Sequence, residues 1–375
     1  MNRAIYLDHN ATAPMLAAAR TAMADALQQT GNPSSVHGFG RSARRLVEDA
    51  RARVAVAINA PGAGLVFTAS GTEANNMALR GVGVGPVVVS AVEHDSVLKA
   101  SNDPIVAPVD RNGVVDLAAL ERLASRFRPR VISVMLANNE TGVLQPVRDV
   151  VRIARASGAL CHCDAIQAVG KVAVDMAALG VDMLSLSSHK IGGPQGVGAL
   201  AVREGLEIEP LLRGGGQERR RRGGSENVAG IVAFGVAASA VNDHLMLSRS
   251  VCALRDAAEN RLRTIVPTAR IFGAEAARLP NTSCIEMPGV SAETQVMAFD
   301  LAGIAVSAGS ACSSGKVGAS HVLLAMGLDE HASRSAIRVS FGIGNTMADV
   351  ERLVDVWSAL AGRHGGQRAA SEAAA

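Results

Sequence analysis

The sequence predicts an α/β protein with a large domain on a mostly parallel sheet and a smaller second domain. One observation is the length of 375 residues, which exceeds what a single hydrophobic core usually supports. Another is the alternation of short apolar, β-branched runs with helical stretches between about residues 15 and 205. This alternation is typical of βαβ units whose strands are covered on both faces.

The individual elements follow from local patterns. A helix is expected over 41–59, where Val47, Ala50 and Val54 share one face. Strands are expected at "PVVVSAVEH", "RVISVMLANNE", "ALCHCDAIQ", "VDMLSLSSHK" and "GVGALAVR". Residues 226–262 have an Ala-rich helical pattern, and two later strands are expected at "NTSCIEM" and "SAIRVSFG". A last helix is predicted from Thr346, which forms a capping-box pattern with Asp349. Residues 363–375 have no apolar stripe and are predicted to be a disordered tail.

Composition excludes several classes of protein. The apolar runs fall short of the roughly 18 residues that a membrane span needs, and the N-terminus has no signal-peptide pattern. Five irregularly spaced cysteines favour a reducing cytoplasm over a disulfide framework. A net charge of +3 gives no reason to expect a nucleic acid or a membrane as partner. The run Arg219 to Arg222 is better interpreted as loop contacts or a docking surface for an acidic partner.

Polar residues recur where the predicted strands end: His94, Asn139, Asp164 and Lys190. The carboxyl ends of the strands in an open parallel sheet form the crevice in which ligands bind. Because four such groups are expected at one edge, the sequence predicts a site there.

Lys190 suggests what the site binds. An arbitrary lysine is usually a solvated surface residue, but this one follows an apolar strand in a chain with only four lysines. A desolvated lysine forms Schiff bases readily, and Ser187 and His189 beside it supply donors for a phosphate. The pattern is typical of a pyridoxal 5'-phosphate (PLP) site.

Other residues fit the same cofactor. "TASGTEANN" places Gly71 and Thr72 at a predicted helix start, where a phosphate binds well, although such caps are also common without a ligand. Asp164 suits the pyridinium nitrogen, Gln167 could reach the phenolic oxygen, and His94 could cover the ring and shuttle protons.

The chain resembles the NifS/IscS-type cysteine desulfurases. The resemblance runs from residue 5 to about residue 345 and rests on "YLDHNATAP", "GNPSSVHGFGR", "FTASGTEANN", "VEHDSVL", "NNETGVLQP", "CDAIQAVGK", "SSHKIGGPQGVGAL", "GGGQERRRRGGSEN" and "SAGSACSSG". It implies the fold-type-I PLP fold of the aspartate aminotransferase superfamily and a homodimer. The large PLP-binding domain would be 15–255, and 1–14 with 256–362 would form the small domain that carries the catalytic cysteine.

The resemblance also implies roles for individual residues. Lys190 would hold PLP as the internal aldimine and act as the base, with His94 stacked on the ring. Arg338 would clamp the substrate carboxylate. The remaining assignments are Asp164 at the pyridinium nitrogen, Gln167 and Asn139 near the phenolic oxygen and substrate, and Thr72, Ser187 and His189 at the phosphate.

Ser225 would reach the PLP phosphate of the other subunit. The family has "RxRSGT" where this chain reads "RRRRGGSEN", so Gly223 replaces Ser and Ser225 replaces Thr. Arg220 stands where the family usually has Gly, and Ala13 departs from the usual Thr.

Cys312 lies in "SAGSACSSGKVGAS", where neither packing nor charge explains a thiol. In the family this thiolate attacks the sulfur of the bound cysteine and becomes a persulfide, leaving alanine. L-cysteine is then the substrate, and the sulfur acceptor is an iron–sulfur scaffold or a similar protein. Nitrogenase supply, general iron–sulfur assembly and tRNA thiolation all remain open.

Two alternative interpretations are less well supported by the sequence. A selenocysteine lyase, a cysteine sulfinate desulfinase or another class V PLP aminotransferase would use the same cofactor site with less need for Cys312. The "CHC" of residues 161–163 suggests a metal, but on a strand the two thiols face away from His162, so no metal is expected.

Overall fold

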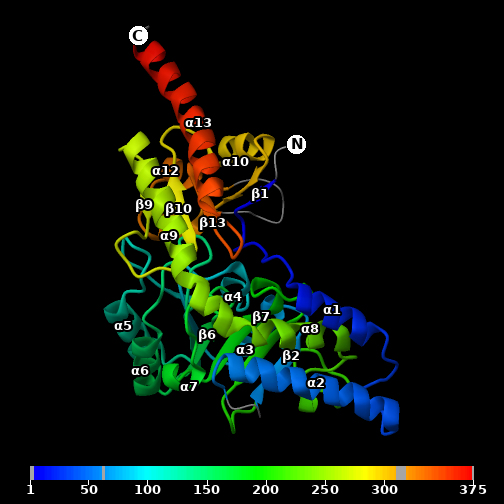
Figure 1. The fold of residues 1–375 in the computed structure, drawn as a ribbon. Helices are drawn as coiled ribbons and strands as arrows, with labels where there is room; N and C mark the ends of the chain where they lie inside the picture. Colours follow the sequence, from blue (N-terminus) through cyan, green and yellow to red (C-terminus); the bar gives the residue numbers. More distant parts are fainter. Residues whose placement is uncertain (1–3, 61–63, 310–317, 374–375) are drawn as a thin grey trace.

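The larger part of the molecule is built on a seven-stranded sheet (Figure 1). The computed structural model describes residues 4–60, 64–309 and 318–373, with 364–373 described by backbone alone. The strands follow the order β2-β8-β7-β6-β5-β3-β4. Their bounds are β2 (Val66–Thr68), β3 (Val87–Ser90), β4 (Ile105–Ala107), β5 (Val131–Ser133), β6 (Leu160–Asp164), β7 (Met183–Ser187) and β8 (Gly198–Val202).

The sheet is mostly parallel, as the sequence predicts. The exception is β8, which pairs antiparallel with both β2 and β7. The segment 188–197 that joins β7 to β8 is too short for the crossover that a parallel pair requires. The run "GVGALAVR" is therefore a strand, as expected, but lies outside the βαβ pattern.

Both faces of the sheet are covered. On β3, Val88 belongs to one apolar cluster and Val87 and Val89 to another. The first cluster packs under α2 (Gly38–Ala57), α5 (Leu117–Phe127), α6 (Val147–Ser157) and α8 (Val228–Ser239), with α1 (Ala17–Leu27) against α8. The second packs under α3 (Gly71–Arg80) and α4 (Asp95–Leu98). This double cover explains why the strands are apolar throughout.

A second, smaller part contains two further sheets. One has the order β12-β13-β10-β9, and the other pairs β1 with β11. Its strands are β1 (Ile5–Tyr6), β9 (Ile271–Phe272), β10 (Thr282–Glu286), β11 (Ile304–Ala305), β12 (Ser307–Ala308) and β13 (Ala336–Ser340). Its helices are α10 (Ala292–Leu301), α11 (His321–Ala325), α12 (Glu330–Arg334) and α13 (Met347–Ala373). The N-terminal strand therefore joins a core formed by residues near the C-terminus.

Helix α9 (Val241–Ile265) connects the two parts (Figure 1). Its first half lies over the large sheet, and its second half packs against α13 in the core of the small part. Each part thus has its own hydrophobic core. The domain bounds given above remain a prediction.

The last helix differs from the prediction at its end. Asp349 accepts the Thr346 N–H at 2.9 Å, which fits the predicted cap. However, α13 continues to Ala373, across residues expected to form a disordered tail. The tail is rich in Ala, with Arg, Gln and Glu, and these residues have high helix propensities. An absent apolar stripe shows that a helix is not packed, rather than that it is not formed.

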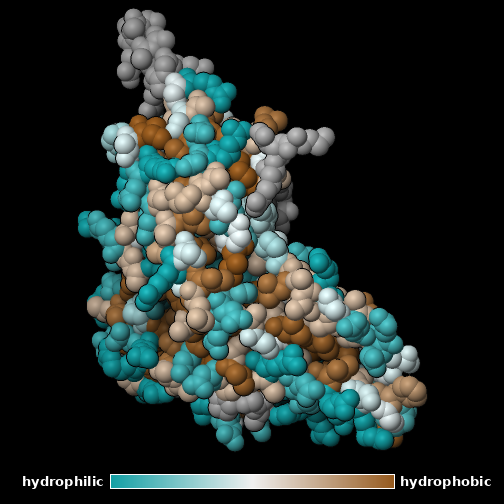
Figure 2. Space-filling view, viewed as in Figure 1, coloured by the Kyte–Doolittle hydropathy of each residue, from teal (hydrophilic) through white to brown (hydrophobic). Residues whose placement is uncertain are grey.

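The surface carries both hydrophilic and hydrophobic side chains (Figure 2). Large apolar side chains are exposed on and between α1 and α2, namely Leu27, Val36 and Phe39. Among the described residues no single helix is long and apolar enough to cross a membrane. Helices α8 and α9, which are bent by 55° where they meet, reach that length and apolar composition only when they are taken together.

Candidate active site

A cavity of about 250 Å³ lies at the carboxyl ends of β3, β5, β6 and β7. These four strands are neighbours in the sheet, so residues that follow them in the sequence meet in space. Nine residues predicted from the sequence line the cavity: Gly71, Thr72, His94, Asn139, Asp164, Gln167, Ser187, His189 and Lys190.

The start of α3 forms one wall. The Ser70 side chain caps the helix by accepting the Glu73 N–H at 3.1 Å. The first N–H groups of a helix have no partner within it, and the helix dipole favours an anion there. A Cβ on Gly71 would lie 2.2 Å from Ile166 Cδ1, so this turn has no room for a side chain. The wall is therefore suited to a phosphate.

Asp164 lies buried at the end of β6. Oδ2 accepts from Asn75 Nδ2 at 2.7 Å and Oδ1 from the Ile166 N–H at 2.9 Å. Burial raises the pKa of this carboxyl, and those two hydrogen bonds and the nearby His94 and Lys190 oppose the rise. A buried carboxylate of raised basicity is well suited to hold a proton on a ring nitrogen.

His94 is the N-cap of α4. Its Nδ1 accepts the Ser96 N–H at 3.1 Å and lies 2.8 Å from Ser96 Oγ. Desolvation lowers the pKa of His94, against the attraction of Asp164. An imidazole whose Nδ1 accepts carries its proton on Nε2, so the neutral ring can stack on a planar group and exchange a proton.

Lys190 follows β7 in a 3₁₀ turn over Ser188–Lys190. Its Nζ donates to the backbone carbonyls of Asn10 and Ala11, the latter at 2.8 Å. Desolvation and then Arg338 lower the Lys190 pKa to about 8, while Asp8 and Asp164 act in the opposite direction. The lowered pKa makes this amine easier to deprotonate than an ordinary lysine, which favours Schiff-base formation.

His189 also lies on the cavity wall, where its Nδ1 is 3.2 Å from Thr12 Oγ1. Desolvation, followed by Lys190 and Lys171, lowers the pKa of His189 to about 4. The ring is neutral at physiological pH, so it would approach a phosphate as a hydrogen-bond donor and not as a cation.

Arg338 lies beside the cavity without lining it. Its Nη1 donates to the Asn139 carbonyl at 3.0 Å, and its Nη2 forms a buried ion pair with Asp8 at 2.8 Å. Nε has no partner among the described residues. The Nη2 donor that would bind a substrate carboxylate is thus already paired with Asp8.

Ser225 is exposed and does not line the cavity of its own chain. The loop before it contains Arg220 at φ 67°, a left-handed conformation that Gly adopts without strain. Glu218, also left-handed, is buried and forms a bidentate ion pair with Arg51 at 2.7 and 3.0 Å. This pair holds the loop in the conformation that the family's glycine would favour.

Cys312 lies outside the described residues. Cys161, Cys163 and Cys284 are buried free thiols, and burial raises the pKa of each. His162 is held between the Ser133 and Ser185 hydroxyls at 2.8 and 2.9 Å. The described residues contain no group of three or more His, Cys, Asp or Glu side chains placed to hold a metal ion.

Several residues of the site are not among those predicted from the sequence. Asn75 and Ser96 hold Asp164 and His94, and Asn75 is the fourth residue of "TEANN", one helical turn from Thr72. Asn10 is buried with 1% exposure and bonds to both parts of the molecule. Its position in "LDHNATAP" gave no local sign of this role.

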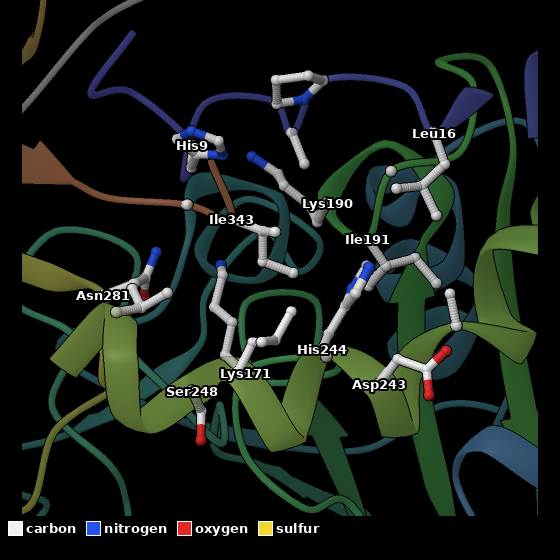
Figure 3. A pocket seen from close by; sticks show the side chains of 18 of the residues that line it. His9, Leu16, Lys171, Lys190, Ile191, Asp243, His244, Ser248, Asn281 and Ile343 are labelled. Carbon is white, nitrogen blue, oxygen red and sulfur yellow. The ribbon is translucent and has the colours of Figure 1, made fainter. Parts of the chain in front are cut away.

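A second cavity of about 490 Å³ lies on the other side of Lys190 (Figure 3). Lys171 and Lys190 lie on its walls, and α9 contributes Asp243, His244 and Ser248 (Figure 3). It is larger than the first cavity, but Asp164 and the N-terminus of α3 line only the first. The smaller cavity therefore matches the predicted site better than the larger one.

The class-V aminotransferase model matches residues 5–353. The chain belongs to this family. It is 42% identical over 94% of both chains to a cysteine desulfurase of Cereibacter sphaeroides, and 38% identical to the cysteine desulfurase IscS of Dictyoglomus turgidum, over 95% of this chain and 94% of that one.

Solved structures agree with this assignment. A NifS-like protein from Rickettsia africae has a TM-score of 0.89 and 35% identity over 95% of this chain and 98% of that one. SspA, solved in complex with cysteine, has a TM-score of 0.78 and 28% identity over 90% of this chain and 99% of that one. The predicted resemblance and fold class are confirmed.

Proposed function

We propose that this class-V protein is a cysteine desulfurase, which uses PLP to remove sulfur from L-cysteine and produces L-alanine and a persulfide on Cys312. The observation that carries the proposal is the convergence of nine predicted residues on one cavity, with Lys190 at its wall. The names of the relatives support the choice of cysteine as substrate.

The donor set fits PLP at each of its polar groups. The α3 N-terminus with Thr72, Ser187 and His189 would bind the phosphate, and Asp164 would hold the ring nitrogen. Lys190 is the amine to which the cofactor would be joined. When bound, PLP supplies the electron sink that makes the Cα proton of an amino acid removable.

Side chains of this protein would transfer the protons and bind the substrate carboxylate. The Lys190 amine, once free, would take the Cα proton, and His94 would cover the ring and exchange protons with the substrate. Arg338 would hold the substrate carboxylate through Nη2 after exchanging its bond to Asp8. Asn139 would keep this guanidinium in place through its carbonyl.

Cys312 would receive the sulfur. Its thiolate forms an S–S bond to the substrate sulfur, and the Cβ–S bond breaks with its electron pair retained by carbon, which a proton completes to the methyl group of alanine. The enzyme is left with a persulfide on Cys312, which a sulfur-acceptor protein would accept.

The assembly would be a homodimer in the cytoplasm. The exposed apolar side chains Leu27, Val36 and Phe39 favour burial against a second copy. Ser225, exposed in its own chain, would donate to the PLP phosphate of the other subunit. The reduced cysteines fit a reducing compartment.

The test is to incubate the protein with L-cysteine without reductant, to assay alanine, and to locate added sulfur by mass spectrometry. We expect alanine together with a persulfide on Cys312, both lost in Cys312→Ser. Cys252→Ser on α9 is the matched control, because this thiol is half-buried outside the cavity, and it should leave both unchanged. Undiminished alanine release by Cys312→Ser would indicate a lyase acting on selenocysteine or cysteine sulfinate.

A further inference from the structure

Lys171 lies behind the candidate active site and has no acidic partner. Its Nζ donates to Gln167 Oε1 at 2.7 Å and to Asn10 Oδ1 at 3.1 Å. Among the described residues it forms no salt bridge, and burial, with Lys190 and Arg338 acting in the same direction, lowers its pKa well below the usual value. A lysine placed at this cost serves some purpose other than a surface ion pair.

The partners of Gln167 determine the orientation of its amide. Nε2 donates to the Asn10 carbonyl at 2.9 Å, and a carbonyl oxygen can only accept, so nitrogen must lie on that side. Oε1 then faces Lys171, which donates to it. The second N–H of Nε2 has no partner among the described residues, and Gln167 lines the cofactor cavity.

Asn10 keeps the Lys171 amine beside the Gln167 amide by accepting a second hydrogen bond from it. Its Oδ1 accepts from Lys171 and from Asn281 Nδ2 at 3.1 Å. Its Nδ2 donates to the Asn139 carbonyl at 3.2 Å and to Thr282 Oγ1 at 2.9 Å. The side-chain amide has therefore used all its donors and acceptors, and at 1% exposure it has no alternative partner in water.

We propose that Lys171 is a positioning residue that fixes the Gln167 amide with one N–H directed to the cavity, where it donates to the phenolic oxygen of PLP. The inference rests on the proposed function. Lys171 is the donor to the buried Oε1, and donation there polarises the amide, which strengthens its N–H groups as donors. Without Lys171, Oε1 is left unsatisfied and the amide turns to seek another donor.

The test is a double-mutant cycle of Lys171→Met and Gln167→Ala. The PLP dissociation constant is measured on the apoprotein, and the pH midpoint of the visible cofactor band on the reconstituted protein. We expect Lys171→Met to weaken PLP binding about tenfold and to raise the midpoint by about one pH unit. A bond to the phenolic oxygen stabilises its negative charge without the proton on the Lys190 nitrogen, so losing the bond makes that proton harder to remove.

In the Gln167→Ala background the same substitution should change binding by no more than about twofold. Equal effects in both backgrounds would refute the proposal, because Lys171 would then act through its charge or through folding. Lys99→Met is the control for loss of a lysine charge, since Lys99 is exposed at the C-cap of α4 and pairs with Asp95. It should leave the dissociation constant and the midpoint unchanged.

Lys171→Gln separates donation from charge, since an amide can still donate to Oε1. Binding within about threefold of the wild-type value supports positioning, and behaviour like Lys171→Met refutes it. Unchanged thermal midpoints of the apoprotein show that the variants fold. If the wild-type protein gives no cofactor band, the proposed function fails. If the wild-type protein gives the band, and Lys171→Met has the same PLP dissociation constant and pH midpoint, only this inference fails.

Discussion

Glu93 offers a quantitative test of the electrostatics beside the active site. It is completely buried directly before His94, and its Oε1 accepts from Ser90 Oγ at 2.5 Å and from the Met135 N–H at 2.8 Å. Oε2 has no partner among the described residues. Burial raises the pKa of this carboxyl from 4.5 to about 8, so the folded protein holds it protonated at neutral pH.

The sign of the pH dependence follows from this shift. Between pH 4.5 and about 8 the unfolded chain has lost the Glu93 proton and the folded protein has kept it, so stability falls as pH rises. At pH 7, about 2.5 pH units above the unfolded pKa, the loss of stability is about 3.5 kcal/mol, since each unit corresponds to about 1.4 kcal/mol. Glu93→Gln keeps the shape and the Oε1 acceptor but cannot ionise, so it removes this loss.

The measurement is the free energy of unfolding of the apoprotein by urea, followed by circular dichroism at pH 5 and pH 7. The stability of Glu93→Gln relative to the wild type should increase by about 2 to 3 kcal/mol between these pH values. Glu121→Gln, at an exposed position on α5, is the control and should show the same difference at both. If the free energy of unfolding of Glu93→Gln differed from that of the wild type by the same amount at pH 5 and pH 7, the reasoning would be refuted, because the Glu93 carboxyl would then be ionised in the folded protein.

Two further predictions concern the cavity and its arginine. Gly71→Ala should displace Ile166 toward the cavity, because the new Cβ would lie 2.2 Å from Ile166 Cδ1. We expect PLP binding to weaken about tenfold. PLP titration of the apoprotein would show this, and wild-type affinity would contradict it. Asp8→Asn should lower the KM for L-cysteine severalfold at a cost of about 1 to 3 kcal/mol in stability, because Arg338 loses its buried counter-ion and becomes available to the substrate carboxylate. Steady-state kinetics would decide this, and a raised KM would mean that Asp8 orients Arg338.

The sequence by itself determined the sheet and most of the cavity. Apolar, β-branched runs and the polar residues that end them are local features, and parallel strands bring their carboxyl ends together whatever the details of packing. Lys190, Asp164 and His94 could therefore be assigned to one site before any contact was known. Local pattern failed at the end of α13, where residues without an apolar stripe still extend the helix to Ala373.

Only the tertiary structure decided which groups hold these residues in place. Asp8 reaches Arg338 across 330 positions of the sequence, Asn10 reaches Lys171 across 161, and Asn75 reaches Asp164 across 89. Sequence periodicity does not predict such pairs, because these side chains are placed by buried hydrogen bonds and not by a helical or strand repeat. The residue types that give the site its chemistry are evident from short sequence motifs. The orientation of their side chains and their electrostatics depend on contacts that form only when both parts of the chain have folded around the N-terminal segment.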